Sequence, residues 1–266
     1  LRKGTATYAL MMDDDVVCEP EGIIRQVTFG DLARRPTIVG GHMFSLYARS
    51  RLHSFGEIVH PWRFWWKTPE DGYMQWDFGT RNIRSARWLH KRVDVDFNGW
   101  FSCLIPRQVI DEIGLSLPLF IKWDDAEYGL RARAHGFPTV TFRVPRCGTS
   151  RGRTRTTRST GSRTSTCATA SSPPCCTRPS RARPVIREVF NNQLAHLVAM
   201  QYSTAELRLQ AMEDVLRGPQ ALHEMLPTRL AEVNATRKEF SDAQLVADVD
   251  TLPPAADGEA AQEGPH

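Results

Sequence analysis

The sequence has no apolar run of roughly eighteen residues, the length that a membrane-spanning helix needs, so we expect no transmembrane segment. Its first residues, 1–5, contain neither a Met nor the apolar core of a secretory signal peptide. No two cysteines have the Cys-x-x-Cys spacing of a structural zinc site. We therefore expect the cysteines to be reduced thiols in the cytoplasm. The chain would lie either in the interior of the cytoplasm or at the cytoplasmic face of the membrane.

Lysine and acidic residues are absent from Arg143 to Arg183, although this stretch contains ten arginines. The rest of the chain has 24 basic and 30 acidic residues, so the net charge of +4 comes wholly from this tract. An arginine-rich arm that binds nucleic acid would have such a composition. A solvated linker without a partner would have it as well.

We favour a third interpretation, in which the tract is translated out of frame. Arg without Lys, beside Ser, Thr, Pro and the adjacent Cys175 and Cys176, is what a GC-rich gene yields in a wrong frame. The codons of residues 147–149 overlap a frame that allows an apolar residue, then Trp or Arg, then His, Asn, Asp or Tyr. The original frame would resume near Pro184. Because the tract has almost no large apolar residue, we predict that residues 146–183 are disordered.

The stretch 8–12 is apolar and is followed at once by three carboxylates, which is typical of a buried strand that ends in a ligand site. Asp13 and Asp15 are two residues apart, so their side chains point the same way from an extended backbone. Hard oxygen ligands of this kind suit Mg²⁺ or Mn²⁺. A solvated acidic turn is the alternative for this triplet taken alone.

A second acidic site follows the apolar run 119–121, where Asp124 and Asp125 open a stretch with helical periodicity. We expect one of them to be the helix N-cap. Two adjacent Asp residues are more than one cap needs, so the other is free to act as a general base. Two acidic sites would also suit another metal-dependent phosphoryl or nucleotidyl transferase.

Five motifs occur in order along the chain, at residues 11–15, 40–47, 55–58, 94–100 and 118–130. Together they resemble the bacterial cell-wall galactan galactofuranosyltransferases. That resemblance implies an α/β fold of the GT-A (Rossmann-like nucleotide-sugar) type with a parallel sheet. It also implies inverting transfer of galactofuranose from UDP-galactofuranose to a lipid-linked galactan, with Mn²⁺ or Mg²⁺ as cofactor. No nucleic acid partner is expected, and the resemblance allows a peripheral membrane contact and a homo-oligomer in the intact protein.

The resemblance also assigns site residues. Asp13 and Asp15 would hold the metal, and Asp125 would be the catalytic base on the acceptor hydroxyl. Asp124 and Glu57 would be acceptor-site carboxylates.

Three further positions follow from the same comparison with the family. Trp100 would help form the sugar platform, and Phe101 stands where the family commonly has a second Trp, so stacking should survive. The third metal ligand of the family is a His, and Thr149 occupies its place here.

The expected organisation has four parts. Residues 1–145 would be the C-terminal half of a GT-A domain that lacks its uridine-binding N-terminal half, so we expect an inactive fragment. Residues 146–183 are the predicted disordered tract, 184–250 a helical domain and 251–266 a disordered tail. Within the helical part we predict helices over 185–200, from a capping box at 203–206 to Leu216, and over 220–240 with a break near Pro227.

Overall fold

The computed structural model describes residues 4–60, 65–69, 76–80, 82–119, 123–142, 147–149 and 182–244. Its strands are β1 (Tyr8–Met11), β2 (Val16–Cys18), β3 (Ile38–Gly40), β4 (Met43–Ser45), β5 (Leu52–Ser54), β6 (Ile58–His60), β7 (Trp65–Lys67), β8 (Val93–Val95), β9 (Cys103–Pro106), β10 (Thr139–Thr141) and β11 (Cys147–Thr149). Its α-helices are α1 (Pro20–Leu32), α2 (Arg107–Ile113), α3 (Asp124–Ala134), α6 (Ala182–Val198), α7 (Tyr202–Leu216), α8 (Ala221–Met225) and α9 (Arg229–Lys238). Short 3₁₀ helices are η1 (Ile83–Ser85), η2 (Arg87–His90) and η5 (Ser241–Ala243).

The central sheet has five strands in the order β1-β9-β3-β10-β8. β9 runs antiparallel to both of its neighbours, β1 and β3. β10 is parallel to β3 and antiparallel to β8. The α/β class is therefore confirmed, but the sheet that we expected to be parallel is mixed. Because β1, β3 and β10 point the same way, their carboxyl ends share one edge of the sheet.

β1 is less buried than its apolar sequence predicts. Of its four residues only Ala9 is buried, because β1 lies at the end of the sheet and no other described strand pairs with its far side.

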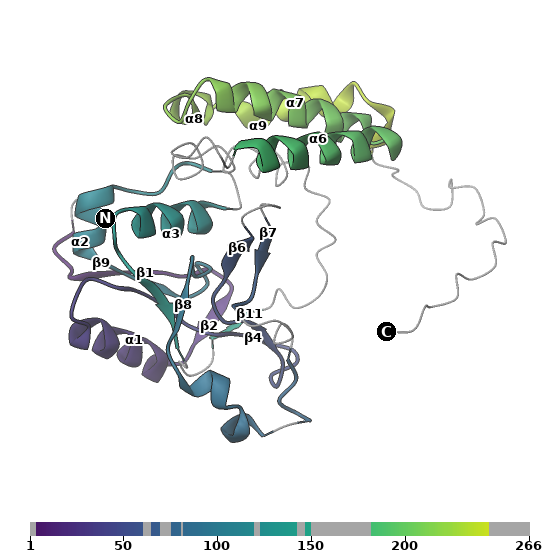
Figure 1. Ribbon diagram of the computed structural model, residues 1–266. Helices are drawn as coiled ribbons and strands as arrows, with labels where there is room; N and C mark the ends of the chain where they lie inside the picture. Colours follow the sequence, from purple (N-terminus) through teal and green to yellow (C-terminus); the bar gives the residue numbers. More distant parts are fainter. Residues whose placement is uncertain are drawn as a thin grey trace.

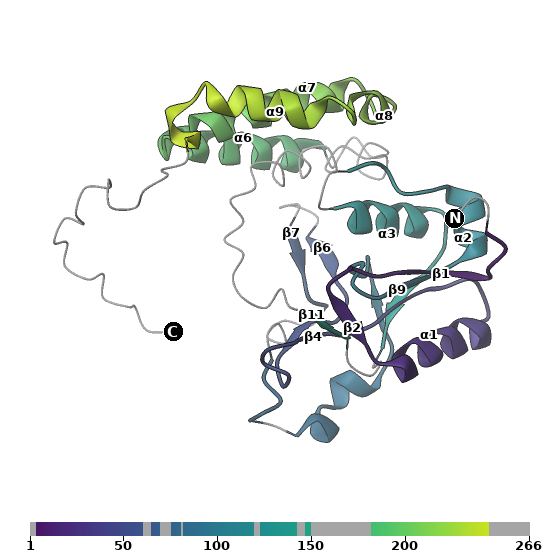
Figure 2. The same cartoon turned by 180° about the vertical axis from the view of Figure 1, so that it is seen from behind.

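Helices cover both faces of the central sheet (Figure 1 and Figure 2). Side chains alternate between the faces, as in any strand. Val39 and Leu104 point to the α1 face, where Phe29 packs against them. Ile38 and Ile105 point to the other face and pack with residues of α2 and α3. Full burial of each such side chain stabilises the fold by roughly 1.5–3 kcal/mol, so this alternation fixes the register of the strands.

A second, four-stranded sheet has the order β2-β11-β4-β5 and carries its own aromatic core. Phe44, Leu52, Phe55 and Trp88 are buried there, with the rings of Phe55 and Trp88 4.9 Å apart. β11 lies inside the tract that we predicted to be disordered, so that prediction is wrong for residues 147–149. Residues 150–181 and the predicted disordered tail, 251–266, lie outside the described part of the chain.

Helices α6 to α9 form a layer of their own on the α3 side of the sheet (Figure 1 and Figure 2). The helices predicted in this part are found, including the break near Pro227 between α8 and α9. The predicted capping box is not formed, because α7 begins at Tyr202 and Ser203 is already helical. The Ser203 backbone N–H and hydroxyl instead donate to the Asp242 carboxylate, at 2.7–3.2 Å. Among the described helices, none is long and apolar enough to cross a bilayer.

Candidate active site

Asp13 and Asp15 lie where the chain leaves the carboxyl end of β1. Both are half-buried, whereas Asp14 between them is exposed. One carboxylate oxygen of Asp15 is shielded from solvent. The Val16 N–H donates to the Asp13 carbonyl at 3.4 Å, so the chain turns directly into β2. The turn therefore holds the two predicted metal carboxylates at the carboxyl edge of the central sheet.

β11 brings position 149 next to this turn. Thr149 is the cross-strand partner of Val16 on β2 and of Ser45 on β4. Val16 directly follows Asp15, so the position at which the family has a histidine lies beside a predicted metal carboxylate. The register therefore places position 149 beside the predicted metal site.

Asp124 and Asp125 form the first two residues of α3. Neither is the N-cap that we predicted, because Trp123 caps the helix with a left-handed backbone (φ 74°). The Ala126 N–H donates to Asp125 Oδ1 at 2.7 Å. Both carboxylates sit at the positive end of the helix dipole, which stabilises their ionised forms and partly offsets the cost of burial.

Glu57 is held in a buried loop between β5 and β6. Its backbone pairs with Phe97, just after β8. Its side chain is 7% exposed and accepts a hydrogen bond from the Ser54 hydroxyl at 2.6 Å. A second hydrogen bond comes from the Gly99 backbone, which also favours the ionised form. Burial outweighs both bonds and raises the pKa of Glu57 to about 7.

Electrostatic coupling shows that these carboxylates, which are distant in sequence, share one site. Burial raises the pKa of Asp125 well above its ordinary range, and the negative charges of Glu57 and Asp124 raise it further. Burial also raises the pKa of Asp124, with smaller contributions from Asp13 and Glu127. The structure thus brings Asp13, Glu57, Asp124 and Asp125 together at the carboxyl edge.

Glu127 does not extend this cluster. It is buried, and its carboxylate is paired with the Arg131 guanidinium at 2.7 and 3.0 Å. The paired charges tie the first turns of α3 together, so Glu127 is a structural residue of the helix.

Trp100 is half-buried and directly follows Gly99, whose backbone donates a hydrogen bond to Glu57. Its ring meets the Tyr128 ring edge to face, with the centroids 6.2 Å apart. Phe101, which we expected to stack on a sugar, is only 5% exposed. A Cβ on Gly99 would lie 2.6 Å from the Phe101 ring, so that ring packs on the backbone instead. Of the two predicted aromatic residues, only Trp100 is partly exposed.

The described residues offer a hard divalent cation a partial set of ligands. No group of three or more His, Cys, Asp or Glu side chains in this part of the chain is placed to bind one ion. Mg²⁺, however, is often held by one or two carboxylates together with water and substrate phosphates. Asp13 and Asp15 fit that mode, and the shielded Asp15 oxygen is consistent with it.

Two neighbours of the cluster could not be found from the sequence. Ser54 positions Glu57, but its Ser-x-x-Glu spacing resembles a capping box and does not indicate a loop contact. Cys103 is buried in β9, and burial together with the charge of Asp125 raises the pKa of its thiol. Both contacts depend on strand pairing between distant segments.

Comparison with known proteins identifies the family. The family model described as "Glycosyltransferase like family 2" matches residues 1–169, which is more than half of the chain. The chain belongs to glycosyltransferase family 2. A second family model, "Galactofuranosyltransferase-2, domain 3", matches residues 185–265, which include the described helices α6 to α9. The two matches cover both the α/β part of this family 2 chain and its helical part.

The chain is homologous to the galactofuranosyltransferases GlfT2 of two mycobacteria. It is 36% identical to the protein of Mycolicibacterium smegmatis over 262 residues, which is 97% of this chain and 41% of the relative. It is 34% identical to the Mycobacterium tuberculosis protein over 265 residues, again 41% of the relative. The family 2 chain thus spans about two fifths of the length of these relatives. The comparisons give no support to a nucleic-acid-binding protein or to another phosphoryl transferase.

Proposed function

We propose that this chain contributes the acceptor side and the catalytic base of an enzyme that transfers galactofuranose from UDP-galactofuranose to a lipid-linked galactan with inversion. Two named galactofuranosyltransferases as relatives support this substrate class. The observation that carries the proposal is the convergence of Asp125, Asp124, Glu57 and Asp13 at the carboxyl edge of the sheet. In open α/β sheets this edge is where ligands bind.

In the proposed reaction Asp125 accepts the proton of the attacking galactan hydroxyl. The hydroxyl oxygen forms a bond to the anomeric carbon of galactofuranose while the bond from that carbon to the UDP oxygen breaks, and UDP leaves with the electron pair. A carboxylate of ordinary pKa is a weak base. Burial and the nearby charges of Glu57 and Asp124 raise the pKa of Asp125 and so increase its basicity.

The other residues orient the sugars. Glu57 and Asp124 have carboxylate oxygens that can accept hydrogen bonds from acceptor hydroxyls, and the partly exposed ring of Trp100 can stack on a sugar ring. Asp13 and Asp15 would hold Mn²⁺ or Mg²⁺, which when bound neutralises negative charge on the departing diphosphate.

The proposal includes the inactivity of this chain by itself. With Thr149 in place of a histidine ligand, we expect weak cation binding and no turnover of UDP-galactofuranose. We place the enzyme in the cytoplasm, with peripheral contact at the membrane face where its lipid-linked acceptor lies. A homo-oligomer is a further expectation from the resemblance.

A chimera tests the proposal. Residues 1–266 would replace the matching region of the M. smegmatis relative, once as printed and once with residues 143–183 taken from that relative. We expect the second chimera to release UDP from UDP-galactofuranose when a galactan oligosaccharide is present, and the first to be slower by roughly a hundredfold or more. Circular dichroism shows whether each chimera is folded.

Competing donors make the test specific. A folded second chimera that uses UDP-galactopyranose or UDP-glucose faster than UDP-galactofuranose would contradict the proposed substrate. Asp111→Asn, an exposed carboxylate on α2 paired with Arg107 at 2.8 Å, is the matched control and should retain the rate.

A further inference from the structure

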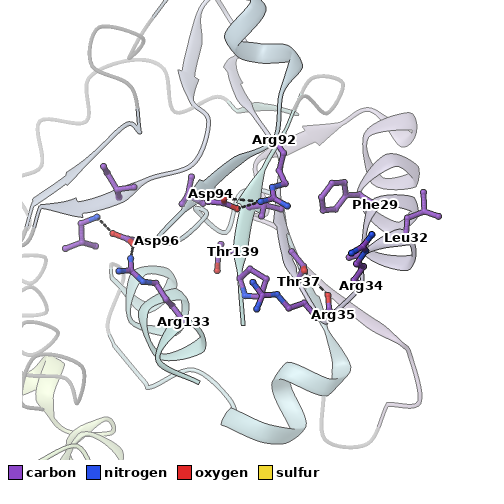
Figure 3. A pocket seen from close by; sticks show the side chains of 16 residues that line it. Phe29, Leu32, Arg34, Arg35, Thr37, Arg92, Asp94, Asp96, Arg133 and Thr139 are labelled. Atoms are coloured by element: carbon purple, nitrogen blue, oxygen red, sulfur yellow. Dashed lines mark hydrogen bonds and ion pairs between the residues drawn. The ribbon is translucent and has the colours of Figure 1, made fainter. Parts of the chain in front are cut away.

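A cavity of about 910 Å³ lies at the edge of the sheet opposite the carboxylate cluster (Figure 3). It is lined by Thr37, just before β3, and by Thr139, the first residue of β10. Because β3 and β10 are parallel, these are the amino ends of the strands, whereas Asp13 follows the carboxyl end of β1. The cavity is therefore separate from the proposed active site, and its volume is typical of small-molecule sites.

The cavity carries uncommitted positive charge. Arg34 and Arg35 line it from the chain that follows α1, and neither guanidinium has a partner among the described residues. Arg92 also lines it but is paired with Asp94 at 3.0 Å. Arg133, the fourth arginine of the lining, is likewise paired with an aspartate, Asp96. The lining thus has a surplus of two positive charges, both from the α1 side (Figure 3).

Thr139 supplies an independent sign of a ligand. Its side chain is 4% exposed, and its hydroxyl is buried without a hydrogen-bond partner in the described part of the chain. A buried polar group without a partner costs about 1–3 kcal/mol. Thr139 belongs to the lining of the cavity, and rotation of its side chain would present this hydroxyl to a ligand oxygen there.

The lining is also pre-organised and partly apolar. The Thr37 hydroxyl donates to the Arg35 carbonyl at 2.8 Å, which fixes the segment that carries the two free arginines. Phe29, Val59 and Val140 provide apolar walls. The same cavity can therefore receive a charged group and an apolar group of one ligand.

We propose that this cavity binds an organic phosphate, with its phosphate on Arg34, Arg35 and Thr139 and its apolar part against Phe29 and the neighbouring valines. Guanidinium groups bind phosphate through paired N–H donors. A phosphate dianion has enough acceptor oxygens to meet two guanidinium groups and one hydroxyl at once. A carboxylate has fewer, so it should bind more weakly.

Calorimetry of the 266-residue chain in EDTA tests the proposal, with phenyl phosphate, inorganic phosphate and benzoate as probes. We expect phenyl phosphate to bind at least tenfold more tightly than either of the others. The double variant Arg34→Ala, Arg35→Ala should weaken phenyl phosphate at least tenfold, whereas Arg84→Ala, an exposed arginine outside the cavity, should not. Thr139→Val should weaken binding several-fold without lowering the melting temperature of the free chain, because it removes the unpaired hydroxyl.

A vesicle experiment identifies the source of the phosphate. Vesicles of phosphatidylcholine with phosphatidic acid that displace phenyl phosphate, and fail to bind the double arginine variant, would assign the site to a lipid headgroup. Displacement by soluble esters alone would assign it to a free organic phosphate. The proposal is overturned if phenyl phosphate binds no better than inorganic phosphate, or binds the double variant as well as the unchanged chain. Neither result depends on the proposed transferase activity.

Discussion

The negative charge of Glu57 raises the pKa of Asp125, although the two residues come from different parts of the chain. Glu57 is fixed by its pairing with Phe97, and Asp125 by the start of α3. Two buried carboxyl groups whose charges act on each other resist simultaneous ionisation. The pair therefore titrates at a higher pH than ordinary carboxylic acids, and both stability and activity should depend on it.

Glu57→Gln should change the pH dependence of stability. The ordinary pKa of Glu is 4.5, and that of Glu57 in the folded chain is about 7. Between these values the folded chain holds a proton that the unfolded chain has lost, so the free energy of unfolding falls as pH rises from about 4.5 to about 7. Glutamine cannot ionise, so the variant should avoid this fall and be more stable than the unchanged chain above pH 7, by at most roughly 3 kcal/mol.

Urea denaturation between pH 4 and pH 8 measures this difference. Glu112→Gln, on the exposed side of α2, controls for the substitution itself. Parallel curves for Glu57→Gln and the unchanged chain would show that Glu57 is ionised throughout, contrary to our account.

Thr149→His should strengthen Mn²⁺ binding at least tenfold. Position 149 pairs with Val16, beside Asp15, so an imidazole there would add a protein ligand to the two carboxylates. Titration calorimetry gives the affinity of both chains, and Thr149→Ala should show no gain. Micromolar binding by the unchanged chain, with no improvement in the histidine variant, would mean that another residue supplies the third ligand.

The arginine-rich tract should be the first target of trypsin. Its composition cannot bury enough apolar surface to offset roughly 1–2 kcal/mol per ordered backbone residue. We expect rapid cleavage between Arg151 and Arg181 in the present chain, and slow cleavage after the reading frame is restored. Equal rates for the two chains would remove the support for a frameshift and favour a genuine arginine-rich arm.

Gly56→Ala should destabilise the chain more than Gly136→Ala. Both glycines have positive φ, 90° and 86°, so alanine costs roughly 1–2 kcal/mol at either position. At Gly56 the added Cβ would also lie 2.8 Å from a methyl group of Thr141, whereas nothing lies within 4 Å at Gly136. We expect roughly 1–3 kcal/mol more destabilisation at Gly56 in thermal unfolding. Equal losses would mean that the loop before Glu57 yields at little cost.

The local elements were largely predictable because their signals lie within a few residues. The apolar run before Asp13 predicted the strand β1. Gly218 lies just after the end of α7, and Pro227 lies just before the start of α9, as their helix-breaking character predicts. The errors came from long-range contacts. Asp242 replaces the predicted capping box at Ser203, and β9, which enters the sheet from far along the chain, makes it mixed.

The sequence offers candidate residues for the site but not their arrangement. The motifs named Glu57, Asp124 and Asp125, but nothing local shows that their charges interact. The cavity was missed because Arg35 and Thr139 belong to no motif and come together only when β3 and β10 pair. Such sites are defined by sheet topology.

The most direct test of the central claim is the kcat of Asp125→Asn in the chimera that carries the relative's residues at 143–183. Asparagine keeps the shape of the side chain and cannot accept the proton, so we predict a fall in kcat of roughly a hundred- to ten-thousandfold, with KM little changed. Asp111→Asn should leave kcat unaltered. A kcat for Asp125→Asn equal to that of the unchanged chimera would contradict the assignment of Asp125 as the base.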